Sequence, residues 1–140
     1  MTISFGFFSD QGLTIPATSI QASQATDGNS AAVDRVVYYG SNASLKTLVT
    51  ASSPYSGHIT FTPVDANAGS GVQASHIKLA TTQAGLAAAI AGVAIDLGPT
   101  LQSGKENAVA IWMRIDTPAL AAGVYTDITL TSNSLREENA

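Results

Sequence analysis

Two histidines are the residues of this chain best suited to acid–base or metal chemistry. His58 and His76 could meet in space, and with an aspartate they would form a metal site or an acid–base pair. Each histidine, however, directly precedes an isoleucine in an alternating segment, His58 before Ile59 and His76 before Ile77, so the two side chains of each pair lie on opposite faces. Because successive strand side chains point to opposite faces, we expect both rings in solvent, with no catalytic or metal-binding role.

Three further patterns resemble functional motifs but fail on spacing. The segment Gly98–Lys105 has one residue too many between its glycines for a phosphate-binding loop and lacks the Ser or Thr that should follow the lysine. The segment Asp65–His76 begins like a calcium loop but ends on His where Glu is needed. The chain also lacks the Gly-x-Ser-x-Gly elbow of a serine hydrolase. We therefore predict a protein that is not an enzyme and has no metal or cofactor.

We expect β-strands to position the residues discussed above, because apolar and polar positions alternate along much of the chain. The clearest case is 107–116, where one face carries Val109, Ile111, Met113 and Ile115. Alternation recurs in 3–7, 59–62, 77–79, 93–97 and 123–131. The segment 33–40 carries apolar residues on both faces, which suits a central strand between two layers, and 45–50 predicts a weaker strand. Short strands separated by turns predict an all-β domain, a jelly-roll or immunoglobulin-like β-sandwich. Val124, Ile128 and Leu130 are expected in its core.

The chain divides into three parts by composition and hydrophobic periodicity. Residues 1–31 are rich in Ser, Thr, Gln and Ala with isolated apolar residues, and they predict an extended N-terminal arm that is ordered mainly by a partner. Residues 32–135 form the predicted sandwich, and residues 136–140 a polar C-terminal tail without a structural role. Thr81–Gly92 could form a single short helix, since Thr can cap a helix and Gly can end one.

Composition limits the possible partners. Charged residues make up only 11% of the 140 residues, against roughly 25% in an ordinary domain, which indicates a protein that works docked on something. The net charge of −4 and the scattered basic residues argue against nucleic acid. The apolar run Ala84–Ile95 is shorter than the roughly 20 residues of a membrane span. The first residues show no basic region of a secretory signal, which favours synthesis in a cytoplasm.

Aromatic residues on strong strands are candidates for contact with a partner. Trp112 and Tyr125 fall on the nominally outward side of their strands, and such residues are enriched in interface hot spots. An equally good interpretation is that they cover the second face of a sheet within this protein. The same two interpretations apply to the other candidates, which are Phe5, Phe7, Phe8, Ile15, Tyr38 and Tyr39.

The segments Ile95–Gly98, Asn107–Trp112 and Tyr125–Glu137 resemble small virion proteins of tailed bacteriophages. The chain looks most like the capsid cement proteins of the Bordetella-type short-tailed phages. The resemblance implies a β-sandwich that clamps adjacent major capsid subunits on the outer surface of the virion, as a homo-oligomer and without catalysis. It transfers no functional residue, because the family has no catalytic motif to align.

Two other functions remain open at this point. The chain could be an immunoglobulin-like subunit of a phage tail or baseplate. It could also be a carbohydrate-binding β-sandwich, in which Trp112, Asp116 and Asp127 would share one concave surface.

Overall fold

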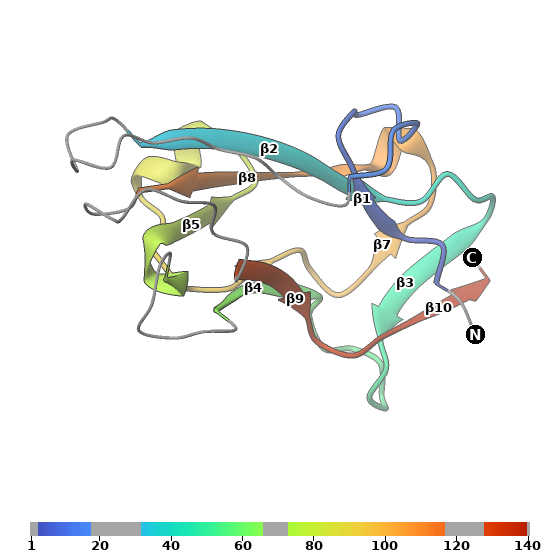
Figure 1. Ribbon diagram of the computed structural model, residues 1–140. Helices are drawn as coiled ribbons and strands as arrows, with labels where there is room; N and C mark the ends of the chain where they lie inside the picture. Colours follow the sequence, from blue (N-terminus) through green and yellow to red (C-terminus); the bar gives the residue numbers. More distant parts are fainter. Residues whose placement is uncertain (1–2, 18–31, 66–72, 117–127, 140) are drawn as a thin grey trace.

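The segments 33–40 and 107–116, both predicted as strands, contribute the two middle strands of the largest sheet, as the computed structural model shows (Figure 1). The structure describes residues 3–17, 32–65, 73–116 and 128–139. Strand β2 (Val33–Gly40) pairs antiparallel with β8 (Val109–Ile115), and the four-stranded sheet has the order β1-β2-β8-β5. Its outer strands are β1 (Gly6–Phe8) and β5 (Ile77–Ala80). We call it sheet A.

Two smaller antiparallel sheets complete the architecture. The first has the order β10-β3-β7, formed by β10 (Leu135–Asn139), β3 (Lys46–Thr50) and β7 (Leu101–Gln102). The second has the order β6-β4-β9, formed by β6 (Ile95–Asp96), β4 (Thr60–Asp65) and β9 (Ile128–Ser132). The described residues contain no α-helix, so the predicted all-β character is confirmed. Three short 3₁₀ turns join strands: η1 (Ala74–His76), η2 (Ala84–Ala87) and η3 (Lys105–Asn107).

The core receives side chains from all three sheets. Ile111 and Met113 are buried, and Val109, Ile115, Ile128 and Leu130 pack against them as partly buried residues, as their alternation predicts. Val124 lies outside the described residues. The other buried members of this cluster are Phe5, Val37, Tyr39, Leu48, Ile59, Phe61, Ile77, Leu79, Ile95 and Leu101.

The N-terminal residues belong to the fold, contrary to the prediction of an arm ordered by a partner. Phe5 is only 8% exposed and lies in the core, and Leu13 is only 1% exposed. After β1 the chain turns back and bonds to it again, with Ala17 N donating to Phe7 O over 3.0 Å. The prediction is therefore wrong for residues 3–17, and residues 18–31 lie outside the described part.

The C-terminal residues also differ from the prediction. Residues 136–139, which were expected in a polar tail, form most of β10 and pair with β3 from Val49 to Lys46. Backbone hydrogen bonds hold an edge strand in place, so its side chains do not need to be apolar. Charged side chains are common on edge strands because they discourage pairing with other chains.

The predicted helix over 81–92 is reduced to the single 3₁₀ turn η2. Its bonds run from Leu86 N to Gln83 O and from Ala88 N to Gly85 O, three residues apart. Small side chains give this segment almost no apolar face with which to stabilise a helix, and Leu86 is its one fully buried side chain. Gly85 and Gly92 weaken helix formation further.

Candidate partner-binding surface

The aromatic candidates of sheet A are divided between its two faces. Phe7 pairs with Tyr39 across β1 and β2, and both face the core, where the Phe7 ring lies 5.1 Å from that of Tyr39 and 5.2 Å from that of Phe61. The Tyr39 and Phe61 rings are 4.7 Å apart. Phe5 and Tyr39 are buried, so they build the core and leave almost no surface for a partner.

The opposite face of sheet A carries the residues adjacent in sequence to Phe7 and Tyr39, because side chains alternate between the two faces. Phe8 pairs with Tyr38, and one row further along the sheet Val36 pairs with Trp112. All four are half-buried. This outer face is partly covered by the protein itself, which favours the interpretation that Trp112 and its neighbours stabilise the second face of the sheet.

Two segments of the chain cover the ends of this outer face. At one end, a Cβ built on Gly40 would lie 3.0 Å from Leu13 Cδ1, so the Leu13 side chain occupies the space above that glycine. At the other end, η2 contacts β5 and β8 and brings the fully buried Leu86. Both leucines lie outside the main core cluster. Leu13 and Leu86 thus cover the two ends of the outer face, and its centre lies between them.

The remaining interface candidates have different positions. Ile15, in the turn that follows β1, is 58% exposed and is the most accessible of the described candidates. Tyr125 lies outside the described residues, as does Asp127 of the carbohydrate-site alternative.

The most apolar exposed segment of the described chain is residues 84–94, which we call the apolar loop. It contains no polar side chain, and no charged residue occurs between Lys78 and Asp96. Ile90 is 72% exposed and Val93 52% exposed. Isolated exposed apolar residues are ordinary, but a continuous uncharged segment with two large exposed side chains is a typical partner-contact surface.

The apolar loop is held in place at both ends. Leu86 is its anchor, because the side chain is fully buried while η2 rests on β5 and β8. At the other end, Gly92 N donates to Ile77 O over 2.8 Å, and Gly92 has a positive φ of 81° that suits glycine. Ile90 is therefore presented between two fixed points, and Val93 directly follows the second, which reduces the entropy lost on binding.

This surface was not predicted from the sequence. Residues 81–92 were predicted as a possible helix, 93–97 as a strand, and Ala84–Ile95 as a run too short to span a membrane. Two features of residues 84–94 could have indicated a contact surface: the segment has no polar side chains, and its apolar residues show no periodicity. Such a segment forms no amphipathic element and interacts poorly with water, which suits a contact with a partner. Among the described residues, no helix is long and apolar enough to cross a bilayer.

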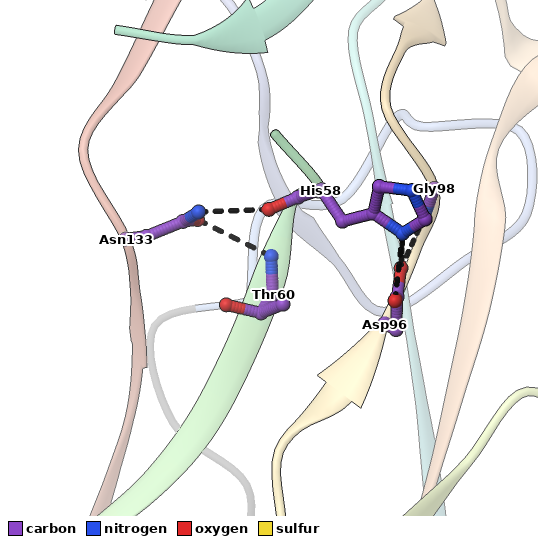
Figure 2. Close-up of polar contacts among 5 residues, drawn as sticks. All are labelled: His58, Thr60, Asp96, Gly98 and Asn133. Atoms are coloured by element: carbon purple, nitrogen blue, oxygen red, sulfur yellow. Dashed lines mark hydrogen bonds and ion pairs between the residues drawn. The ribbon is translucent and has the colours of Figure 1, made fainter. Parts of the chain in front are cut away.

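A polar cluster connects two strands and a turn at another place in the fold (Figure 2). His58 Nδ1 lies 2.7 Å from Asp96 Oδ2, and Gly98 N donates to Asp96 Oδ1 over 2.7 Å. Asn133 Nδ2 donates to His58 O over 2.8 Å, and its Oδ1 accepts from Thr60 N. The backbone bond from Gly98, followed by the bond from His58, lowers the pKa of Asp96.

This cluster connects β4, β6 and the turn between β9 and β10, and the two histidines occupy separate environments. His58 is exposed as expected, whereas His76 is half-buried and its Nδ1 accepts from Gln73 N over 3.0 Å. In the described part of the chain no side-chain hydroxyl hydrogen-bonds to the His58 ring. The bonds of His58, Asp96 and Asn133 cross-link these three parts of the chain.

A surface hollow of about 410 Å³ lies beside His58, lined in part by Thr50, Ser52, Gly57 and Asn133. The Thr50 hydroxyl is buried without a hydrogen-bond partner, and the absent side chain of Gly57 leaves space next to it. Such a site suits one small polar group, such as a water molecule. Within the described ranges, no three His, Cys, Asp or Glu side chains are grouped so that they could hold a metal ion.

One ion pair fixes the outer face of sheet A. Arg114 Nε donates to Asp34 Oδ1 over 2.8 Å, and Arg114 Nη2 donates to Asp34 Oδ2 over 3.1 Å, which makes the pair bidentate. The bond from Arg114 lowers the pKa of Asp34, and Gln83 adds a further bond of 3.2 Å to the same carboxylate. Because Gln83 precedes η2, this contact also holds the apolar loop against the sheet.

Comparison with known proteins adds no relative. No protein-family model, no curated protein and no solved structure matches this chain.

Proposed function

We propose that this protein is a non-enzymatic structural protein of a phage virion, a cement protein that decorates the outer surface of the capsid. Its three sheets would form a β-sandwich of the jelly-roll or immunoglobulin-like kind. In this proposal the chain is made in the host cytoplasm and binds the major capsid protein, with further copies of itself as neighbours on the shell. Neither nucleic acid nor a membrane takes part.

The observation that carries the proposal is the apolar loop, residues 84–94. A surface of uncharged small side chains with Ile90 and Val93 at its most exposed points gains free energy only by leaving water. Such a loop loses nothing by desolvation of charges, because none is present from 79 to 95. A preformed apolar protrusion of this kind fits a shallow apolar depression on a protein surface, which a shell of repeated subunits offers many times.

A contact made by one short loop is suited to a multivalent assembly. Exposed patches of a few hundred Å² are smaller than the roughly 800 Å² per partner of a stable isolated complex. A weak contact becomes effective when many copies bind a lattice and each copy is held by more than one contact. The low fraction of charged residues, 11%, agrees with a protein whose surface is packed against other proteins in an assembly.

The test is binding of the purified chain to empty shells assembled from the major capsid subunit of the same virus. We expect the wild-type chain to sediment with the shells, and the double variant Ile90→Ser/Val93→Ser to bind about 30- to 150-fold more weakly. This range follows from about 2–3 kcal/mol for the apolar area that the two side chains would bury. Val64→Ser is the matched control, since Val64 is 41% exposed but lies on β4.

Both variants should unfold within about 0.5 kcal/mol of the wild type, because their substitutions lie at exposed positions. Equal binding of wild type and double variant would exclude the apolar loop as the contact. If the wild-type chain does not bind shells but binds isolated tails or a glycan, the proposal is wrong and the protein is a tail or carbohydrate-binding module.

A further inference from the structure

The three sheets end in edge strands, and in the described parts of the chain all but one of these edges are protected against pairing. Proteins block edges with a cover, proline, charged side chains or very short strands. Beside β1, Pro16 forms a bridge with Phe8, and beside β5, Gly92 N donates to Ile77 O. Strand β10 carries three charged side chains, and β6 and β7 have only two residues each.

Strand β9 is the unprotected edge. Its five residues, Ile-Thr-Leu-Thr-Ser, include no charged side chain and no proline. It lies outermost in its sheet next to β4, and among the described residues its backbone has no hydrogen-bond partner outside β4. Thr129 and Thr131 are exposed, whereas the other three residues are half-buried. An uncharged strand of this length offers a row of free backbone groups to another strand.

A proline in β4 determines which backbone groups of β9 face outward. Pro63 pairs with Leu130 and has no N–H, so these two residues form a non-hydrogen-bonded pair. Such pairs alternate with hydrogen-bonded pairs in an antiparallel ladder, so Thr129 and Thr131 bond to β4. The N–H and C=O groups of Leu130, and of the residues two positions before and after it, therefore point away from β4 along the free edge.

This free edge is complementary to itself. When two copies of β9 align antiparallel about Leu130, each Leu130 lies opposite its own copy and Ile128 lies opposite Ser132. The outward backbone groups of the two strands then meet in hydrogen-bonded pairs. On the exposed face Thr129 lies opposite Thr131, and threonine pairs stabilise neighbouring strands. The alignment places no two charged side chains opposite each other, because β9 has none.

We propose that two copies of this protein join through their β9 edges, antiparallel and about a two-fold axis at Leu130. The two three-stranded sheets of order β6-β4-β9 would then form one continuous sheet. The Leu130 side chains pack against the core in each copy and are half-buried, so side by side they would lose more of their contact with water. The inference concerns contact between copies of this chain and does not depend on binding to a shell.

The test is sedimentation equilibrium of the full chain. The contact is small, so we expect a dissociation constant on the order of 100 µM, and the wild type should pass from monomer to dimer between about 10 µM and 1 mM. Thr129→Lys/Thr131→Lys places like charges directly opposite each other in the proposed pairing. This variant should dimerise roughly 10-fold more weakly.

The matched control is Thr62→Lys/Val64→Lys, which adds the same two charges to the same exposed face but on β4, one strand away from the edge. In the dimer these charges lie three strand spacings apart, roughly 14 Å, and salt screens them. The control should therefore dimerise as the wild type does. Circular dichroism should show that both double variants keep the fold, because their substitutions lie on the exposed face.

A third variant, Thr129→Lys/Thr131→Glu, tests the register. In the antiparallel pairing about Leu130, each new positive charge faces a new negative charge, so this variant should dimerise at least as tightly as the wild type. Hydrogen exchange of the wild type gives an independent measurement. The Leu130 N–H should exchange quickly in dilute solution and roughly 10-fold more slowly as the dimer forms, while the N–H groups of Thr129 and Thr131 stay protected throughout.

Several results would overturn the inference. One is a wild type that stays monomeric up to about 1 mM. Another is a Leu130 N–H that is already protected in dilute solution, because the edge is then covered within one chain. If the β4 control dimerises as weakly as Thr129→Lys/Thr131→Lys, added charge and not the edge controls association. If Thr129→Lys/Thr131→Glu dimerises no better than Thr129→Lys/Thr131→Lys, the register is wrong. Shell binding is measured separately, so these failures leave the proposed function standing.

Discussion

Two leucines with the same backbone conformation allow a direct test of whether the N-terminal residues belong to the fold. Leu13 has a φ of 56° and Leu45 a φ of 54°, but Leu13 is 1% exposed and Leu45 75% exposed. Substitution of either by alanine keeps the backbone strain, since alanine also disfavours the left-handed region. Any difference in stability between the two variants therefore reports the burial of the side chain.

The magnitude follows from the position of Leu13. Buried Leu→Ala substitutions destabilise proteins by about 2–5 kcal/mol, with the smaller values where the surroundings can collapse. Leu13 covers Gly40 near the surface and lies outside the main core, so we expect about 2–3 kcal/mol. For a chain of this size that corresponds to a fall in Tm of about 8–12 °C.

The assay is urea and thermal unfolding of the isolated chain, followed by circular dichroism. Leu45→Ala should lie within about 0.5 kcal/mol of wild type, as a solvent-exposed side chain does. If Leu13→Ala is equally harmless, residues 3–17 do not contribute to the stability of the isolated chain, and the original expectation of an arm ordered by its partner would be restored.

Three further predictions concern the core and sheet A. Burial raises the pKa of Tyr39 to about 12, so its neutral form stabilises the fold fully below pH 10, and that stability is lost as the pH rises towards 12; Tyr39→Phe should move alkaline unfolding to higher pH. The hydrogen bond from Arg114 lowers the pKa of Asp34, so the ionised carboxylate stabilises the fold above about pH 4, and this stabilisation is lost in acid. Asp34→Asn should therefore lower Tm at pH 7. A similar loss of Tm at pH 2 would contradict this explanation. A Cβ at Gly40 would lie 3.0 Å from Leu13 Cδ1 and 3.3 Å from Ala108 Cα, so Gly40→Ala should displace Leu13 and lower Tm. Its effect should be smaller in a Leu13→Ala background, where only the contact with Ala108 remains.

Alternation was sufficient to predict the strands that bury one face. The alternating segment 107–116 contains β8, and its apolar phase correctly placed Ile111 and Met113 in the core. The segment 33–40, predicted as a strand from apolar residues on both faces, forms β2. This works because side-chain direction along a strand has a period of two, so the sequence itself records which face is buried. The face of each aromatic in sheet A follows from the same parity once the strands are paired.

Pairing partners could not be predicted from the sequence. Strand β10 is polar and forms because β3 offers it a row of backbone groups, and nothing in residues 136–139 indicates that partner. The same applies to Phe5 and Leu13, which are isolated apolar residues in a polar stretch and become buried only where β1 meets β2. Contacts between segments far apart in the chain depend on the closure of the whole fold, which local periodicity does not encode.

The sequence by itself determined the all-β class, the phase of the main strands and the scarcity of charge. Tertiary structure decided which apolar residues remain in solvent. Ile90, Leu45, Leu13 and Leu86 all have large aliphatic side chains, yet the first two are exposed and the others are buried. The difference arises because burial depends on what the rest of the chain places over a residue, and a surface for a partner is what remains uncovered when the protein's own core is complete.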